Sequence, residues 1–153
     1  MRKLLFALIA SLLLVANASQ LLAHCEVPCG IYGDQRRFET LLEDQQTIAK
    51  AIVQINELAG KSDALSSNQL VRWVTTKESH ATNSQHIIAQ YFMTQRIKPG
   101  TDGYGKKLAA AHAVMVAAMK CKQGADSATS DTLRASILDF YRAYEGKEPN
   151  LEN

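Results

Sequence analysis

Three side chains that bind metals or take part in redox chemistry lie within six positions near the start of the chain. The stretch reads HCEVPCGIY over residues 24–32 and contains His24, Cys25 and Cys29. Thiolates are soft donors, and an imidazole suits nickel, copper, zinc and iron. Structural zinc usually takes four ligands from two cysteine pairs, whereas this stretch has a single C-x3-C pair. A zinc ion would thus lack a fourth ligand from this neighbourhood.

The residues ahead of this stretch are typical of a removable leader. Met1-Arg2-Lys3 form a short basic end, and an uncharged apolar run of twelve residues follows over 4–15. Such a run is too short to span a hydrocarbon core of about 30 Å, so it fits a signal peptide better than a membrane helix. We therefore expect residues 1–23 to be removed and the mature protein to be exported, to the periplasm or the extracellular space.

The position of the cut decides which donors the mature chain offers. The small-residue rule allows cleavage after Ala18, which leaves Ser19 first, or after Ala23, which leaves His24 first. The second cut frees the α-amine of His24 beside the backbone nitrogen of Cys25, and these nitrogens close a chelate ring on one metal. Two nitrogens and two thiolates in a plane suit a d8 ion such as Ni(II), and the His24 imidazole remains for an axial position.

Three further residues of the stretch are consistent with such a site. Pro28 restricts the turn before Cys29, and Gly30 permits close approach of the backbone. Tyr32 adds a phenol that can donate a hydrogen bond to a bound water or a small oxyanion. Each is also ordinary in a turn, so only their combination supports a metal site.

A local disulfide between Cys25 and Cys29 is the alternative interpretation of the pair, and an exported protein favours it. A bond that closes so short a loop stabilises little, and at the terminus it would join no two helices. The third cysteine, Cys121, leaves at least one thiol unpaired. We expect Cys121 to be a small buried apolar residue.

The remainder of the chain is expected to be helical. Apolar residues recur at three- and four-residue steps in four segments, near 35–59, 67–96, 104–122 and 130–145. No segment shows the alternation of a strand, and short connections favour antiparallel neighbours. We therefore predict an all-α fold, an antiparallel up-and-down four-helix bundle over about 35–145 with a metal-binding hook at its N-terminus.

Some individual positions of these helices can also be predicted. Ser130 is a candidate N-cap of the fourth helix. The Lys98-Pro99-Gly100 turn should end the second helix. The apolar face of the second helix should include Leu70, Trp73 and Val74, and that of the third should include Met119.

Length and charge favour one globular domain and give no reason to expect nucleic acid or membrane partners. The chain has 153 residues, of which 46% are hydrophobic and 21% charged, so residues 24–153 suit a single domain. Removing the leader lowers Lys plus Arg from 17 to 15, which equals the number of Asp plus Glu. A neutral mature chain offers no general electrostatic attraction to polyanions.

The stretch at residues 24–32 resembles the nickel hook of nickel superoxide dismutases, whose motif is H-C-x-x-P-C-G-x-Y. All six fixed positions match, and the helical remainder is compatible with that family. The resemblance implies that the His24 amine, the Cys25 amide nitrogen and the thiolates of Cys25 and Cys29 bind nickel equatorially. It implies that the His24 imidazole binds axially in the oxidised state and that Tyr32 steers superoxide and water without binding the metal.

The reaction implied by the resemblance is the disproportionation of superoxide by Ni(II)/Ni(III) cycling. One superoxide is oxidised to oxygen by Ni(III), and a second is reduced by Ni(II), with two protons, to hydrogen peroxide. Thiolate and amidate donors stabilise Ni(III), which explains the cysteines and the free terminus.

The resemblance also implies supporting residues outside the hook. In the family a glutamate of the first helix and an arginine of the second support the axial histidine, and Glu39 is suitably placed in this chain. His80 stands where the arginine is expected, which is a departure from the family. Tyr91 resembles a second family tyrosine close to the metal, although it is also a candidate core aromatic residue.

Assembly and export are further expectations. Family members shield their hooks in a homohexamer, and a surface thiolate beside peroxide would be oxidised, so we expect a homo-oligomer. The leader is the second departure, because it looks secretory whereas many members carry a short pro-sequence; a processing protease is implied.

Two other functions stay open at this point. An exported nickel- or copper-binding helical bundle without turnover would use the same terminal chelate. A structural or interaction protein with a plain Cys25–Cys29 disulfide would need no metal.

Overall fold

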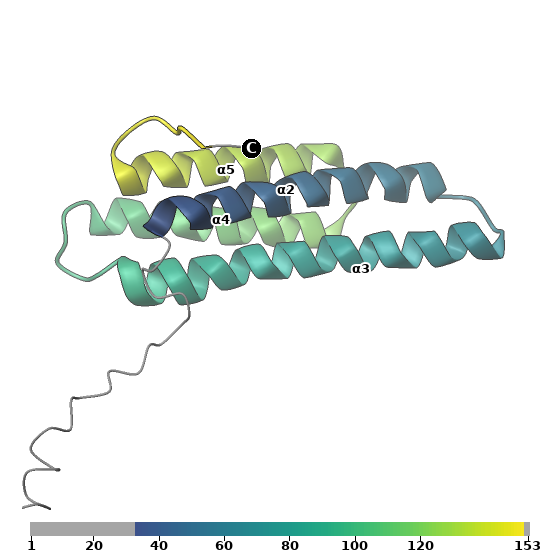
Figure 1. Ribbon diagram of the computed structural model, residues 1–153, viewed down its shortest axis with the longest axis horizontal. Coiled ribbons are helices and arrows are strands. Elements are labelled where there is room, and N and C mark those ends of the chain that lie inside the picture. The colour runs from purple at the N-terminus through teal and green to yellow at the C-terminus, as the bar shows by residue number, and fades with distance from the viewer. Residues whose placement is uncertain (1–32, 152–153) are drawn as a thin grey trace, which may run out of the picture.

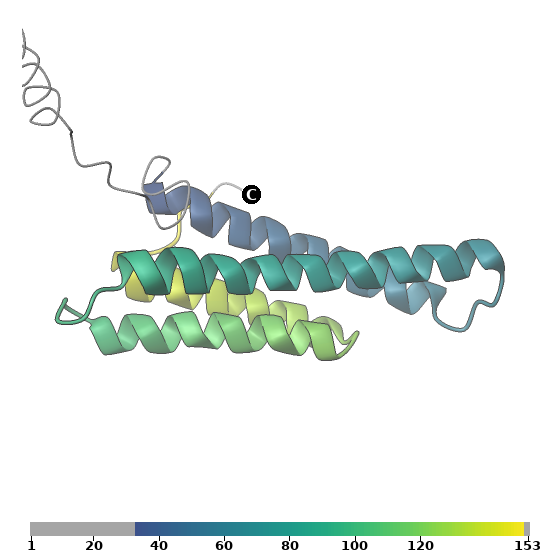
Figure 2. The same cartoon turned by 90° about the horizontal axis from the view of Figure 1, so that it is seen from below.

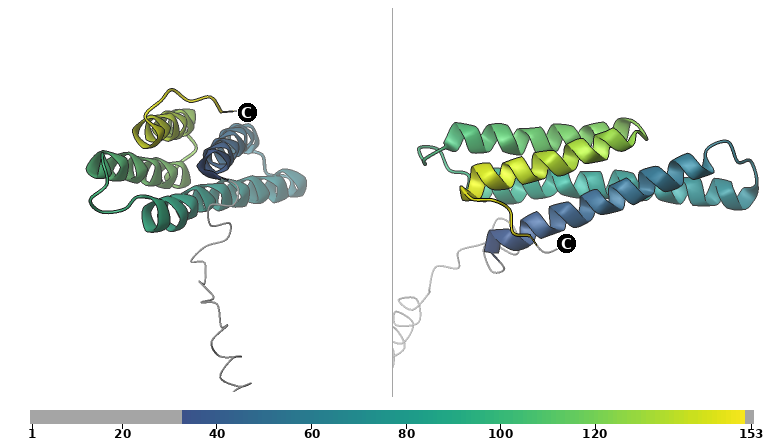
Figure 3. Two further views of the ribbon diagram at one scale, coloured as in Figure 1. Left: turned by 60° about the vertical axis from the view of Figure 1, so that its left-hand side comes forward. Right: turned by 90° about the horizontal axis from the view of Figure 1, so that it is seen from above.

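The computed structural model describes residues 33–151 as an antiparallel bundle of four long helical segments (Figure 1). They are α2 (Gly33–Leu58), α3 (Ala64–His86) continued by the π-helix η1 (Ile87–Arg96), α4 (Tyr104–Gln123) and α5 (Ser127–Glu145). Consecutive helices pack side by side and α5 returns to α2, which closes the bundle (Figure 3, left). The predicted all-α four-helix fold is thus confirmed for the described residues, whereas the leader and the hook lie outside them.

Two helices begin earlier than the sequence pattern indicated. Asp63 caps α3 by accepting a hydrogen bond from the Ser66 amide at 2.9 Å, so the helix starts at Ala64 and not near residue 67. Asp126 caps α5 in the same way, which moves its start to Ser127. The prediction that Ser130 is the N-cap is therefore wrong. An aspartate one turn earlier takes that role, and Ser130 is buried inside the helix.

An aromatic cluster forms the core at the end of the bundle where α2 begins. The Phe38 ring lies 4.8 Å from Phe92 of η1 and 5.2 Å from Phe140 of α5, measured between ring centroids. The rings of Tyr141 and Tyr144 complete the cluster at 4.9 and 5.8 Å from Phe38. Aromatic pairs at such distances stabilise beyond the area they bury, so the start of α2 is firmly joined to η1 and α5.

At the opposite end, α2 and α3 extend beyond the other two helices (Figure 2). Val71 is 65% exposed there and Val74 is 38% exposed, while Leu70 and Trp73 are only half-buried. The prediction that Val74 belongs to the buried apolar face is wrong, and Leu70 and Trp73 are covered only in part, because α4 and α5 are too short to cover this part of α3. Met119, near the end of α4, is also exposed and not in the core as predicted.

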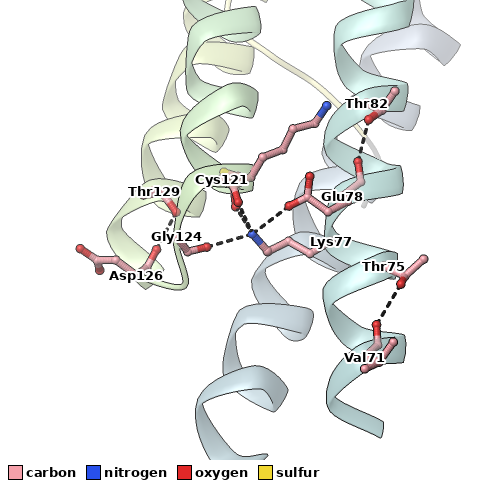
Figure 4. A network of polar contacts seen from close by, with 10 residues as sticks. Val71, Thr75, Lys77, Glu78, Thr82, Cys121, Gly124, Asp126 and Thr129 are labelled. Carbon is pink, nitrogen blue, oxygen red and sulfur yellow. Dashed lines mark hydrogen bonds and ion pairs between the residues drawn. The ribbon is translucent and has the colours of Figure 1, made fainter. Parts of the chain in front are cut away.

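Lys77 marks the point where α3 leaves the core (Figure 4). Its buried ammonium group donates to the carbonyl oxygens of Cys121, Lys122 and Gly124 at 2.5, 2.9 and 2.9 Å. These are carbonyls of the last turn of α4 and of its C-cap, which have no partner within the helix and favour a nearby cation. Glu78 pairs with the same ammonium at 3.3 Å.

Cys121 is fully buried beside this contact, as expected for a small apolar residue. Burial raises the pKa of its thiol above the ordinary value, so the group is neutral. Within residues 33–151 no helix is long and apolar enough to cross a membrane.

Candidate metal centre and the bundle end that supports it

The predicted hook ends at Tyr32, and α2 begins at the next residue, Gly33. Gly33 has a φ angle of +72°, in the left-handed region that favours glycine. A side chain at this position would meet no neighbouring atom among the described residues, so the backbone angle alone is what calls for glycine. The link between the hook and the bundle therefore depends on a residue without a Cβ atom.

Asp34 is the next residue, and three donors from two other elements converge on its carboxylate. Tyr91 donates its hydroxyl to Oδ1 at 2.7 Å, and Arg96 donates Nε–H to the same oxygen at 2.8 Å. Tyr144 of α5 donates its hydroxyl to Oδ2 at 2.7 Å. We call Asp34, Tyr91, Arg96 and Tyr144 the Asp34 clamp. It joins the first turn of α2 to η1 and to α5.

The charge of Asp34 is stabilised by this clamp. Burial by itself raises the pKa of Asp34, but the hydrogen bonds from Arg96, Tyr144 and Tyr91 lower it more, so the net pKa is below its ordinary value. Asp34 is therefore an anion at neutral pH.

Tyr91 is a buried residue of the clamp with unusual charged neighbours. The guanidinium groups of Arg37 and Arg96 lie 5.2 and 5.6 Å from its ring centroid, within the range of cation–π contacts. Burial, followed by the hydrogen bond to Asp34, raises the pKa of Tyr91 to about 12. Its hydroxyl is consequently protonated at neutral pH. Tyr91 is thus a core aromatic residue, as expected, and its closeness to the metal stays a prediction.

The segment that carries Tyr91 is π-helical over ten residues. Its backbone ends with a hydrogen bond from the Ile97 amide to the Phe92 carbonyl, five residues earlier, at 2.8 Å. Two side chains repeat the same spacing: Thr94 donates to the Ala89 carbonyl and Gln95 to the Gln90 carbonyl. π-Helical turns are rare in proteins, and those that occur are often found at functional sites. The sequence pattern did not predict this change of helix type.

Glu39 lies on α2 one and a half turns beyond Asp34. Its carboxylate accepts from Gln35 at 3.3 Å and pairs with Arg36 at 3.6 Å, and its side chain is 22% exposed. Gln35 in turn donates to the backbone of Asn150, so the C-terminal segment also reaches this turn of α2. Glu39 is thus near the hook end of the bundle, and its contact with the axial histidine stays a prediction.

His80 belongs to a second polar cluster farther along the same pair of helices. Its Nδ1 lies 2.7 Å from Oδ1 of Asp44, and Asn83 and Ser84 donate to Oδ2 of Asp44 at 2.8 and 3.2 Å. We call these four residues the Asp44 cluster. Burial raises the pKa of Asp44 above its ordinary value, against the lowering effect of the hydrogen bonds from His80 and Asn83.

The two clusters are separated along the helix axis. Asp34 and Asp44 both lie on α2 and are ten residues apart, or about 15 Å at the rise of an α-helix. Sequence reasoning named His80, Tyr91 and Glu39 but missed Asp34, Asp44 and Arg96. One feature of the sequence could have pointed to Asp34: it follows the hook directly, after a single glycine. The partners of Asp44 and Arg96 come from other helices, which a single sequence does not reveal.

The predicted ligands His24, Cys25 and Cys29, together with Tyr32, lie outside the described residues. Within residues 33–151 no group of three or more His, Cys, Asp or Glu side chains is arranged to hold a metal ion.

Comparison with known proteins gives one match. The family model for nickel-containing superoxide dismutase matches residues 19–148, which include the hook motif and all four helical segments of the bundle. No curated protein and no solved structure matches the chain. The chain therefore belongs to the nickel-containing superoxide dismutase family, and it is an oxidoreductase that acts on superoxide with a nickel cofactor.

Proposed function

We propose that nickel is held by the first residues of the mature chain, through the His24 amine and imidazole, the Cys25 amide nitrogen and the thiolates of Cys25 and Cys29. The observation that carries this assignment is the match at all six fixed positions of the hook motif, within the segment that the family model covers. The chemistry of the donors fits as well, because soft thiolates and nitrogen donors suit nickel. When bound, nickel would supply the one-electron Ni(II)/Ni(III) couple that dismutation of superoxide requires.

The described residues would position the two ends of the hook. Gly33 and Asp34 follow Tyr32 directly in the sequence. The last residue of the hook is therefore two positions away from the residue that the clamp holds. Asp44, which contacts His80, stands about 15 Å along α2 from Asp34. Nine residues can extend to about 30 Å, so this separation allows His24 to reach His80.

His80 is suited to support the imidazole of His24. When Asp44 is ionised, Nδ1 of His80 donates its proton to Oδ1, which fixes the tautomer and leaves Nε2 to bond another group. The His80 side chain is 37% exposed, so a second residue can approach it. In this chain, a histidine oriented by Asp44 would take the place of the arginine that supports the axial ligand elsewhere in the family. Glu39 is proposed for the same support from α2.

Tyr91 and Tyr32, the last residue of the hook, would have different roles. The hydroxyl of Tyr91 is committed to Asp34 and its pKa of about 12 makes it a poor proton donor to a reacting group near neutral pH. Tyr91 would therefore position other groups. Tyr32 is the phenol proposed to orient superoxide and water, and the two protons of hydrogen peroxide would come from solvent.

We also propose export and N-terminal processing. The basic start and apolar run of the leader support secretion to the periplasm or the extracellular space. Cleavage after Ala23 is required by the assignment, because only then is the amine of His24 free. The intact mass of the purified protein measures this directly, and a mature chain that begins at Ser19 and is active would contradict the terminal chelate.

A homo-oligomer, a hexamer by resemblance, is proposed for shielding the hook. Thiolates beside a source of peroxide are oxidised unless they are protected, which supports burial of the hook between subunits. Light scattering of the nickel-loaded protein measures the assembly.

The decisive test of the metal assignment is Cys29→Ser in nickel-loaded mature protein. A serine hydroxyl does not ionise to replace the thiolate, so we expect dismutase activity to fall to background. Cys121→Ser is the matched control, since it also removes one thiol but lies buried in α4, and it should retain activity.

Two results would contradict the proposal. A wild-type protein that binds nickel tightly without turnover would favour a metal-binding bundle. A stoichiometric Cys25–Cys29 disulfide with no nickel, found in protein purified anaerobically, would favour a structural role for the pair.

A further inference from the structure

Asp34 is the first charged residue after the hook, and it is held by three donors from two other elements. We propose that the Asp34 clamp is a positioning device for the nickel hook: Asp34 fixes the point from which the hook extends, and the π-helical form of η1 is what allows Tyr91 and Arg96 to hold one oxygen of Asp34 together. This inference rests on the proposed function of the hook.

The hydrogen bonds of the clamp define both oxygens of the carboxylate. Oδ1 receives two donors, from Tyr91 and Arg96, and Oδ2 receives the hydroxyl of Tyr144. Bonds to an ionised acceptor are about twice as strong as those between neutral groups. Because Tyr91 belongs to η1 and Tyr144 to α5, the side chain of Asp34 cannot move without breaking contacts to two helices. Only Gly33 separates this fixed residue from Tyr32.

The helix type of η1 explains how Tyr91 and Arg96 reach the same atom. They are five residues apart, and in an α-helix this spacing turns two side chains about 140° away from each other. A hydrogen bond between residues i and i+5 closes a wider turn, so side chains five apart are turned less far from each other than in an α-helix. The bond from Ile97 to Phe92 shows that this wider turn persists to the end of the segment.

The charges around Tyr91 give the clamp a second effect. Arg37 of α2 and Arg96 of η1 both face the Tyr91 ring, and Lys107 of α4 lies 5.6 Å from the ring centroid of Tyr144. Asp34 is the acidic group that the described structure places among these cations. Its negative charge keeps the Tyr91 phenol protonated against their influence. Removing this charge should make Tyr91 and Tyr144 easier to ionise, in addition to releasing the start of α2.

The test is Asp34→Asn, which retains the shape of the side chain and one accepting oxygen but removes the charge and replaces the other oxygen with an NH2 donor. Asp139→Asn is the matched control, because Asp139 also pairs with an arginine, Arg142, at 2.9 Å, but is exposed on α5. Circular dichroism establishes that both variants are folded. Spectrophotometric titration of the metal-free proteins should show tyrosine ionisation at lower pH in Asp34→Asn only.

In the nickel-loaded proteins we expect Asp34→Asn to lower the dismutase rate by about tenfold or more. Losses of this size are usual when a residue that orients metal ligands is changed. We also expect it to change the electron paramagnetic resonance spectrum of the oxidised metal, which reports ligand geometry. Asp139→Asn should leave both unchanged. The spectrum separates positioning of the hook from a general loss of stability.

An active wild type whose rate and spectrum are unaltered by Asp34→Asn would overturn this inference and leave the proposed function intact. A wild type that binds nickel but does not dismutate superoxide would overturn the proposed function, and the positioning role with it. In that case the tyrosine titration would still report on the clamp as a structural contact.

Discussion

Asp34 and Asp44 stand ten residues apart on α2, and each accepts three hydrogen bonds from residues of other elements. Their pKa values nevertheless move in opposite directions. At Asp34 a guanidinium and two phenols outweigh the effect of burial. At Asp44 the donors are a histidine, an amide and a hydroxyl, and burial prevails. The charged donor at Asp34 and the deeper burial of Asp44 together explain why three hydrogen bonds lower one pKa and do not lower the other.

The difference suggests that the two carboxylates of α2 have different roles. A permanent anion suits a structural clamp that must not change during the reaction. A carboxylate that orients a half-exposed histidine suits a site where a ligand is held and released. Three predictions test this division, in order of the expected effect.

The largest effect is expected at His80, if it supports the imidazole of His24. His80→Gln retains a polar side chain but cannot supply the imidazole Nε2, so the dismutase rate should fall about tenfold to a hundredfold. Stopped-flow kinetics of the nickel-loaded protein measures this rate. His112→Gln, an exposed histidine on α4, is the matched control and should be unchanged. Equal rates for the two variants would show that His80 does not support the reaction, and the Asp34 clamp would then be the supporting site that is left.

The second prediction compares the two aspartates as structural groups. Asp34→Ala leaves the hydroxyls of Tyr91 and Tyr144 without their acceptor, and Tyr91 is only 3% exposed, so we expect a loss of about 2–4 kcal/mol in the free energy of unfolding. Asp44→Ala should cost about 1–2 kcal/mol, because solvent can reach His80 and Asn83. Urea denaturation of the metal-free variants measures both. A larger loss for Asp44→Ala would reverse the proposed ranking.

The third prediction concerns pH and is the smallest. The ordinary pKa of both groups is 3.8. The lowered pKa of Asp34 contributes stability that is present above pH 3.8 and is lost as the pH falls through the pKa of the folded state. The raised pKa of Asp44 contributes stability that is present below pH 3.8 and is lost as the pH rises through its folded value.

Thermal unfolding of the metal-free protein between about pH 3 and pH 6 checks these signs. Relative to Asp34→Asn, the wild type should gain stability as the pH rises, and relative to Asp44→Asn it should lose stability. Slopes of the same sign for the two variants would show that the two carboxylates are not electrostatically different.

Local sequence patterns predicted the four helices and placed their ends to within three residues, but they did not predict how much of each apolar face is covered. The three- and four-residue recurrence placed Phe38, Leu41 and Ile48 in the core, and all three are fully buried. The same pattern placed Val74 there, but a periodic stripe does not say how far the neighbouring helices extend. The switch to a π-helix after His86 was equally hidden, because the apolar residues of IIAQYFMTQR fit either helix type.

The candidate site divides in the same way. The hook motif could be recognised because its donors and turn residues are adjacent in the sequence, and it stays a prediction because it lies outside the described residues. The residues that would support it depend on long-range pairs, such as Asp34 with Tyr144, which are 110 positions apart. Only the folded bundle brings such residues together.

At one end of the bundle, α2 and the part of α3 that precedes Lys77 extend past the other helices. This extension implies that local stability differs along the bundle. The first three turns of α3 pack against α2 alone, whereas the segment from Lys77 onward is enclosed by the whole bundle. Amide hydrogens of the extension should therefore exchange with solvent through local opening, long before those around Phe38 and Phe92. Such opening would proceed from the end remote from Gly33, so the bundle can fray without disturbing the residues next to the predicted hook.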